Sequence, residues 1–345
     1  MAFSVEIKSS GHRFPVESGE TVLAAALRCG VGLPYGCRNG ACGTCIATLD
    51  SGSVHYPDGE PEALAEEDTD GKLIICQAHP RSDLVISVRE VQAENDISIK
   101  MLPCRAEQLE RLSHDVMLVR LKLPESERLQ FLAGQYVEFI LKDGRRRAFS
   151  IANAPHHDEY LEMHIRHVPG GSFTGHVFEG MRNRALLRIE GPLGSFYLRE
   201  ESRRPILMMA GGTGFAPLKG MLEHAFHIGV DRPVHLFWGV RARRDLYMHD
   251  VAREWEKQFP NFTYTPVLSK PDQADRWQGA SGQLHETLTG CYPDLGEFDI
   301  YMSGPPAMIE AATPALVAQG AHLDHIYSDA FEFAQDVLDK IKQSG

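Results

Sequence analysis

The chain has 345 residues, a length that predicts two or three domains rather than a single core. It carries 47 Asp+Glu against 35 Lys+Arg, for a net charge of −12, and this excess of acid argues against a nucleic-acid partner because a phosphate backbone requires a basic face. No run of about 18 apolar residues predicts a membrane span, and the first residues lack the basic start and apolar stretch of a signal peptide, so we expect a cytoplasmic protein.

Residues 1–92 form the first predicted domain, a small α+β domain of short strands and one helix. Residues 3–8 and 13–16 predict a hairpin, and residues 83–88 predict a later strand. Residues 21–29 are rich in Ala and Leu, which favours a helix with Thr21 as its N-cap.

Four cysteines of this domain have the spacing of an iron–sulfur site. Cys37, Cys42 and Cys45 follow a C-x4-C-x2-C pattern, and Cys76 comes after 30 further residues. This is the spacing of plant-type 2Fe–2S clusters, which need four thiolates, two for each iron. A structural zinc site is the alternative, but such sites usually have two closely paired cysteine turns. Three glycines let the backbone bend around the expected metal-binding loop: Gly36, Gly40 and Gly43.

Other features near this domain allow two interpretations. An acidic run fits either a solvated loop or a docking face for a basic partner, and it comprises Glu66, Glu67, Asp68 and Asp70. Three more cysteines have no neighbour at ligand spacing and are expected to be ordinary thiols: Cys29, Cys104 and Cys291. Residues 93–102 are polar and predict a linker.

Residues 103–199 predict the second domain, an antiparallel β-barrel. Its strand-like segments are separated by Gly and Pro, and they are residues 116–123, 136–141, 147–151 and 161–167. At the third segment, Arg147 can neutralise a pyrophosphate, Phe149 can pack on a ring system, and the Ser150 hydroxyl can form a hydrogen bond to it. Gly170 and Gly171 open a predicted helix, a position that suits a phosphate. Arg147 and its two basic neighbours could also form a surface turn.

Residues 200–345 alternate apolar strands with helices, which predicts a parallel sheet. The expected strands are residues 206–210, 234–238 and 299–302, and the expected helices are residues 218–228, 251–259 and 307–318. Gly211, Gly212, Thr213 and Gly214 directly follow the first strand and precede a helix, the context in which a glycine turn holds a pyrophosphate. An ordinary strand-to-helix turn is the alternative.

Several of these segments resemble the ferredoxin–NADP reductase superfamily. Residues 147–150 resemble its R-x-[YF]-S flavin motif, and residues 211–217 resemble its G-G-T-G-x-A-P turn. Residues 303–308 resemble its C-G-P-P-x-M motif, with Ser303 in place of the Cys. Together with the cysteine-rich domain, the chain resembles the reductase components of bacterial phenol hydroxylases and ring-hydroxylating oxygenases, and also the CDP-6-deoxy-glucoseen reductases.

This resemblance implies a set of cofactor-binding residues. Those expected at the flavin are Arg147, Ala148, Phe149, Ser150, His164, Ile165, Arg166, Gly170, Gly171, Ser172 and Thr174. Those expected at the nicotinamide nucleotide are Gly211, Gly212, Thr213, Gly214, Gly304 and Pro305. The residues expected to act at the reacting rings are Ser150, Ser303 and Phe331, and the alternative for Phe331 is a buried terminal aromatic. Asp329 stands where the family more often has Glu, and its role is left open.

The resemblance also implies a function in electron transport. As an oxidoreductase of this kind, the chain would pass a hydride from NAD(P)H to FAD and then single electrons through a 2Fe–2S cluster to a partner oxygenase, hydroxylase or deoxysugar dehydrase. Analogy favours FAD over FMN and NADH over NADPH. A monomer is also expected. Three arginines could instead accept the 2′-phosphate of NADPH, or form a solvated turn: Arg241, Arg243 and Arg244.

Two other functions are weighed against this one. In a free flavin reductase, the fused cluster would have no function. A redox-sensing iron–sulfur flavoprotein would not need an intact nicotinamide site. Both features therefore favour the electron-transfer reductase.

Overall fold

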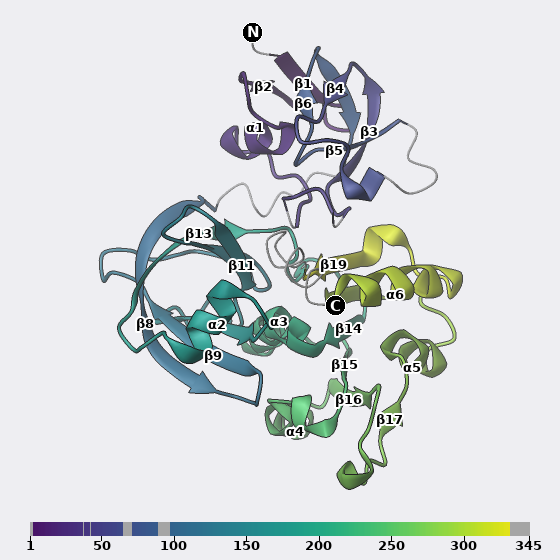
Figure 1. The fold of residues 1–345 in the computed structure, drawn as a ribbon. Helices are drawn as coiled ribbons and strands as arrows, with labels where there is room; N and C mark the ends of the chain where they lie inside the picture. Colours follow the sequence, from purple (N-terminus) through teal and green to yellow (C-terminus); the bar gives the residue numbers. More distant parts are fainter. Residues whose placement is uncertain (1–2, 37, 42, 65–70, 89–96, 332–345) are drawn as a thin grey trace. The chain divides into compact units, whose positions relative to one another are not determined.

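The computed structural model describes residues 3–36, 38–41, 43–64, 71–88 and 97–331 (Figure 1). The chain divides into two compact units. The first is Met1–Ser98 with Gly194–Phe196, and the second is Ile99–Leu193 with Tyr197–Gly345. Among the described residues, no helix combines the length and the apolar character needed to cross a bilayer.

The first unit is built on a mixed five-stranded sheet with the order β2-β1-β7-β3-β5. Its strands are β1 (Phe3–Ile7), β2 (Arg13–Val16), β3 (Ile46–Ser51), β5 (Lys72–Ile74) and β7 (Leu84–Ser87). β1 and β7 run parallel and the other pairs are antiparallel, which is the β-grasp arrangement. The short strands β4 (Val54–His55) and β6 (His79–Pro80) form a separate pair.

The predicted hairpin and helix of this unit are confirmed. Alternation along β1 and β2 places Val5, Ile7 and Phe14 in the core. Helix α1 (Val22–Arg28) begins after Thr21, whose hydroxyl accepts a hydrogen bond from the backbone N–H of Ala24 at 3.1 Å.

The second unit begins with an antiparallel six-stranded barrel of order β11-β10-β13-β8-β9-β12. Its strands are β8 (Lys100–Arg111), β9 (Val116–Lys122), β10 (Tyr136–Ile140), β11 (Arg146–Ser150), β12 (Leu161–Arg166) and β13 (Leu186–Leu193). The two outer strands meet where the N–H of Ala152 donates to the carbonyl of Glu162 at 2.7 Å, so the barrel closes just after β11. β8 starts at Lys100, three residues before the predicted start of this domain.

A parallel six-stranded sheet follows, with the order β17-β16-β15-β14-β18-β19. Its strands are β14 (Ile206–Gly211), β15 (Val234–Val240), β16 (Phe262–Leu268), β17 (Ala280–Ser281), β18 (Asp299–Gly304) and β19 (Ile326–Ala330). The connecting helices are α3 (Phe215–His227), α4 (His249–Gln258), α5 (Leu284–Cys291) and α6 (Pro306–Ala318). The predicted parallel sheet is confirmed, and β16, β17, β19 and α5 add elements that the sequence did not indicate.

Helix α3 is buried along most of its length, because it lies between the sheet and the barrel segment that follows β11. It begins at Phe215, three residues before the predicted start, since Pro217 is tolerated within the first turn of a helix. This position brings the start of α3 close to the predicted flavin motif of the barrel and to the glycine-rich motif of the parallel sheet.

Candidate functional site

Two of the predicted cluster ligands lie together in the first unit. Cys45 and Cys76 are buried, with 2% and 5% of their surface exposed. The N–H of Ile75 donates to the carbonyl of Cys45 at 3.2 Å, so the two thiol-bearing segments are adjacent. Cys37 and Cys42, the other two predicted ligands, lie outside the described residues, as does the acidic run at 66–68 and 70.

The loop before Cys45 has a shape that fits the predicted cluster. Gly40 and Gly43 have φ of +90° and +69°, a conformation that side chains disfavour. The side-chain amide of Gln77 donates to the carbonyl of Arg38 at 2.7 Å and so ties this loop to the segment of the fourth cysteine. Soft thiol donors held by a tight loop suit an iron–sulfur centre.

The cysteines without ligand spacing differ in exposure. Cys104 lies in the barrel core, where burial raises the pKa of its thiol to about 12 and keeps it protonated. Cys29 and Cys291 are exposed, and within the described chain none of the three is in a disulfide.

Strand β11 carries the predicted flavin motif. Its last residue is Ser150, whose hydroxyl donates to the carboxylate of Asp329 at 3.3 Å, although the two are 179 positions apart. The Phe149 ring packs against the barrel rings of Phe139 and Phe173, each with a centroid distance of 5.6 Å. The contact between Phe149 and a flavin therefore stays a prediction, whereas Ser150 has a defined carboxylate partner.

The second predicted flavin segment is a glycine pair that opens α2 (Ser172–Glu179). Gly170 has φ of +77°, and Gly171 is the N-cap of the helix. The Thr174 hydroxyl accepts from the N–H of Val168 at 3.1 Å and braces the turn from inside, while Ser172 is exposed. A glycine turn at a helix N-terminus is an arrangement that suits a phosphate.

The glycine turn, residues 211–214, lies where the parallel sheet reverses its strand order between β14 and β18. In open α/β sheets, this reversal creates a ligand crevice at the carboxyl ends of the strands. A Cβ on Gly214 would lie 1.8 Å from the carbonyl oxygen of Ser303, and one on Gly304 would lie 2.9 Å from the Cα of Gly211. Only glycines allow the ends of these two strands to approach so closely.

The end of strand β18 contains a buried polar group that has no hydrogen-bond partner among the described residues. The Ser303 hydroxyl is fully buried and has no hydrogen-bond partner among the described residues. Leaving a buried hydroxyl unpaired costs about 1–3 kcal/mol, so this atom fits a site that is completed by a polar ligand. The carbonyl of Gly304 accepts from the N–H of Phe331 at 2.8 Å, and Ser303 pairs in register with Asp329. Ser150, Ser303 and Phe331 therefore lie in the same region of the fold.

Arg166 connects the two predicted cofactor sites. It ends strand β12, and its guanidinium Nε lies 3.1 Å from a carboxylate oxygen of Asp115. A Cβ on Gly212 would lie 2.5 Å from the Arg166 guanidinium, so this cation is next to the glycine turn. A guanidinium at a glycine turn suits a pyrophosphate group.

The structure gives the side chains of His164 and Ile165 other surroundings than a flavin. Ile165 is part of the barrel core. His164 is buried, with Nδ1 3.1 Å from the Tyr247 hydroxyl and Nε2 3.2 Å from the Glu162 carboxylate. A role of these two residues at the flavin would therefore depend on their backbone, and it stays a prediction.

Sequence reasoning missed an ionic network between the barrel and α3. The Glu162 carboxylate lies 3.1 Å from the Lys219 ammonium and 3.0 Å from Arg120 Nε. Lys219 is only 6% exposed, and it also pairs with Glu223 at 2.8 Å. The available signal was a charged residue inside each of two apolar runs, residues 161–165 and 215–222.

Electrostatics fixes the protonation of this network. Burial opposes ionisation of Glu162, but the His164 hydrogen bond and the Lys219 charge outweigh it and hold the pKa of Glu162 well below its usual range. Burial lowers the pKa of His164 and outweighs the opposing hydrogen bond to Glu162, while the charge of Lys219 adds to the lowering. Burial also raises the pKa of Tyr247. At neutral pH, Glu162 is therefore ionised while His164 and Tyr247 are neutral.

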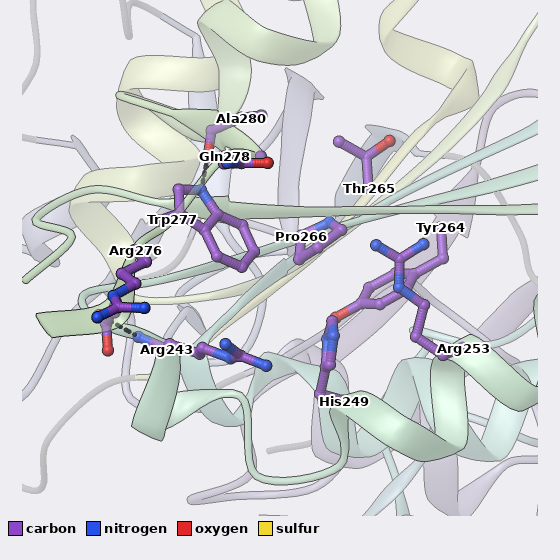
Figure 2. A pocket seen from close by; sticks show the side chains of 12 residues that line it. Arg243, His249, Arg253, Tyr264, Thr265, Pro266, Arg276, Trp277, Gln278 and Ala280 are labelled. Carbon is purple, nitrogen blue, oxygen red and sulfur yellow. Dashed lines mark hydrogen bonds between the residues drawn. The ribbon is translucent and has the colours of Figure 1, made fainter.

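A basic pocket with a volume of about 440 Å³ lies beside β16 (Figure 2). At one end, Arg253 and His249 lie against the Tyr264 ring, at 5.5 and 5.6 Å from its centroid. The indole of Trp277 donates to the carbonyl of Ala280 at 2.8 Å, which holds the aromatic ring over the pocket. The remaining lining residues are Arg243, Thr265, Pro266, Asp275, Arg276, Gln278 and Gly279.

Of the three arginines considered for a 2′-phosphate, the structure places only Arg243 in this pocket. Arg241 and Arg244 are exposed, and Arg244 lies 3.9 Å from Asp245.

Family models match this chain in three consecutive parts. A 2Fe-2S iron-sulfur cluster binding domain matches residues 5–81, an oxidoreductase FAD-binding domain matches residues 103–197, and an oxidoreductase NAD-binding domain matches residues 208–313. The three matches fall on the β-grasp unit, the barrel and the parallel sheet.

Several known proteins are similar to this chain over nearly their full length. The chain is 38% identical over 332 residues to the CDP-6-deoxy-L-threo-D-glycero-4-hexulose-3-dehydrase reductase of Yersinia pestis, covering 96% of this chain and 99% of that protein. It is 33% identical over 343 residues to the phenol hydroxylase P5 protein of Acinetobacter pittii (strain PHEA-2), covering 97% and 96%. A solved cytochrome P450 reductase from Amycolatopsis matches with a TM-score of 0.78 and 34% identity, covering 95% of this chain and 98% of that one.

Proposed function

Because the chain belongs to the ferredoxin–NADP reductase superfamily, in the branch that fuses a 2Fe–2S domain to FAD- and NAD-binding domains, we propose that it is an NAD(P)H-dependent electron-transfer reductase. When bound, the cofactors would supply hydride transfer from NAD(P)H to FAD and single-electron transfer through the 2Fe–2S cluster to a partner. The observation that carries the proposal is the meeting of Ser150, Ser303 and the glycine turn where the parallel sheet reverses its strand order.

Each cofactor has a set of residues proposed to hold it. The cluster would be held by Cys37, Cys42, Cys45 and Cys76. The FAD would be held by the β11 motif, the backbone of β12 and the turn that opens α2. The nicotinamide nucleotide would be held by the glycine turn with Gly304 and Pro305.

Two hydroxyl groups would orient the reacting rings. The Ser150 hydroxyl donates a hydrogen bond to the Asp329 carboxylate, so its oxygen lone pairs can accept a hydrogen bond from a flavin ring N–H. Ser303 has an unused hydroxyl that can bond to the nicotinamide carboxamide. Phe331, held by the carbonyl of Gly304, would cover the flavin face until the nicotinamide ring replaces it.

The coenzyme choice is the next part of the proposal. Similarity within the family favours NADH. The pocket beside β16 nevertheless offers the guanidinium groups of Arg243 and Arg276. The pocket carboxylate of Asp275 accepts a hydrogen bond from the backbone N–H of Arg243 at 3.2 Å. The two guanidinium groups suit a phosphate monoester, so we propose that NADPH is also accepted.

The partner and the setting follow from the same similarity. We propose an oxygenase, hydroxylase or dehydrase component as the electron acceptor, because one relative named above is a dehydrase reductase and another is a phenol hydroxylase protein. We also propose a monomer in the cytosol, a compartment that keeps the cluster cysteines free of disulfides.

An anaerobic titration with NADH tests the proposal. The flavin absorbance should bleach, and a 2Fe–2S EPR signal should rise toward one spin per chain. Bleaching without a cluster signal, in protein shown to contain iron, would contradict electron transfer between the centres. Reduced flavin that passes an ultrafiltration membrane would favour the free flavin reductase, and a cluster that responds to oxidants while NADH has no effect would favour the sensor.

A further inference from the structure

The ionic network that sequence reasoning missed joins the barrel to helix α3. The Glu162 carboxylate on β12 contacts Lys219 of α3 at 3.1 Å, Arg120 of β9 at 3.0 Å and His164 at 3.2 Å. Glu162 and Lys219 are both at least 94% buried. A buried charge that loses its partner is strongly destabilising, so this contact fixes β12 and α3 relative to each other.

Lys219 also reaches the segment that follows the flavin motif. Its ammonium donates to the carbonyl of Ala152 at 3.1 Å, two residues after Ser150. The next residue, Gly220, packs on the same segment, since a Cβ there would lie 3.0 Å from the carbonyl oxygen of Asn153. Helix α3 therefore cannot shift without disturbing the backbone beside Ser150.

A second line of contacts runs from the network to the glycine turn. The ionised Glu162 can only accept, so Nε2 of His164 carries the proton and Nδ1 accepts from the Tyr247 hydroxyl at 3.1 Å. The Tyr247 ring meets the Trp238 ring edge-to-face, with a centroid distance of 5.1 Å and an angle of 85°. The Trp238 indole donates to the carbonyl of Gly212 at 2.9 Å.

Both lines connect the flavin side of the barrel to the start of α3, where the dinucleotide is expected. We propose that Lys219 and Glu162 are positioning residues which, with the hydrogen bond between His164 and Tyr247, set the approach of the nicotinamide ring to the flavin. This inference rests on the proposed function. A purely structural role of the network would lower stability and leave the hydride-transfer rate of the folded protein unchanged.

The first test measures flavin reduction in FAD-loaded Lys219→Met by anaerobic stopped flow. The limiting rate at saturating NADH should fall about 10- to 100-fold, because a displacement near 1 Å is enough for such a loss. The apparent Kd for NADH should change less than the limiting rate, since the residues of the glycine turn are not substituted. A deuterium isotope effect with 4-deuterated NADH should remain or grow, and Lys219→Arg should restore most of the rate.

A matched control comes from a buried carboxylate outside the network, in the parallel sheet. Asp299 is fully buried and contacts Arg232 at 3.1 Å and His325 at 2.9 Å, at the amino ends of the strands and away from the cofactor motifs. Asp299→Asn should lower the midpoint of thermal unfolding without slowing flavin reduction. An equal slowing in this variant would overturn the proposal.

Amide hydrogen exchange provides a readout that does not depend on turnover. Exchange in residues 151–166 and 211–222 should become faster in Lys219→Met and not in Asp299→Asn. If Lys219→Met does not fold, the same measurements are made on Tyr247→Phe, which removes a single hydroxyl from the network. Unchanged limiting rates and unchanged exchange in the folded variants would refute the inference. If wild-type flavin is not reduced by NADH, the proposed function fails, and the exchange comparison still tests the positioning role.

Discussion

The contact between Gly214 and Ser303 leads to a quantitative prediction for Gly214→Ala. Gly214 has φ of −57°, which suits any residue, so the effect of alanine is purely steric. The added Cβ would lie 1.8 Å from the carbonyl oxygen of Ser303, whereas about 3.0 Å is the shortest contact that real Cβ atoms show. The glycine turn or the end of β18 must therefore move by about 1.2 Å, and both are backbone that no rotamer change can relieve.

Overpacking of this kind costs about 1–3 kcal/mol of unfolding free energy, and we expect the upper end of that range. A shift near 1 Å in the glycine turn should also slow NADH-dependent flavin reduction about 100-fold. The assays are urea unfolding and stopped-flow reduction of the FAD-loaded protein. The control is Gly175→Ala in α2, where a Cβ meets open space and should stabilise the helix by up to about 1 kcal/mol. Gly214→Ala with wild-type stability and rate would refute the steric reasoning.

Three further predictions concern other parts of the chain. Cys76→Ser should remove the 2Fe–2S EPR signal but keep flavin bleaching by NADH; loss of both would mean that the cluster supports the reductase fold. Arg243→Ala should raise the KM for NADPH about 10-fold and leave that for NADH unchanged, whereas exposed Arg244→Ala should change neither, and equal effects on both coenzymes would argue against a phosphate contact. Burial and the neighbouring His157 and His227 lower the pKa of His156 to about 4 from 6.5, so the unfolded state binds more protons between these values. Unfolding free energy should therefore fall as pH drops from 6.5 toward 4, and His156→Gln should flatten that dependence in urea titrations.

The motif residues could be located from the sequence because their chemistry depends on short-range order. A strand, a glycine turn and a helix in succession place residues 211–214 at a helix start whatever the rest of the fold does. In the same way, the Thr21 cap and the Gly171 cap follow from a few adjacent residues.

Contacts between distant segments could not be predicted in this way. The pairing of Ser150 with Asp329 depends on β19 adding to the parallel sheet next to β18, and no local pattern encodes that neighbour. The assignment of His164 to the flavin likewise overlooked its side-chain partners, Glu162 and Tyr247, which come from the same strand and from the connection after β15. The surroundings of a buried polar side chain depend on such partners, and the hydrophobic periodicity of its own segment does not reveal them.

The long separation between Ser150 and Asp329 has a consequence during synthesis of the chain. The ribosome adds residues at about 5–20 per second, so Ser150 waits roughly 9–36 s until the residue 179 positions later has been made. During this interval the barrel strands and the first parallel strands can already fold, since their partners precede β19 in the chain. The carboxylate that orders the Ser150 hydroxyl is therefore made late, and a nascent chain whose flavin-binding strands had already folded would still lack the completed site.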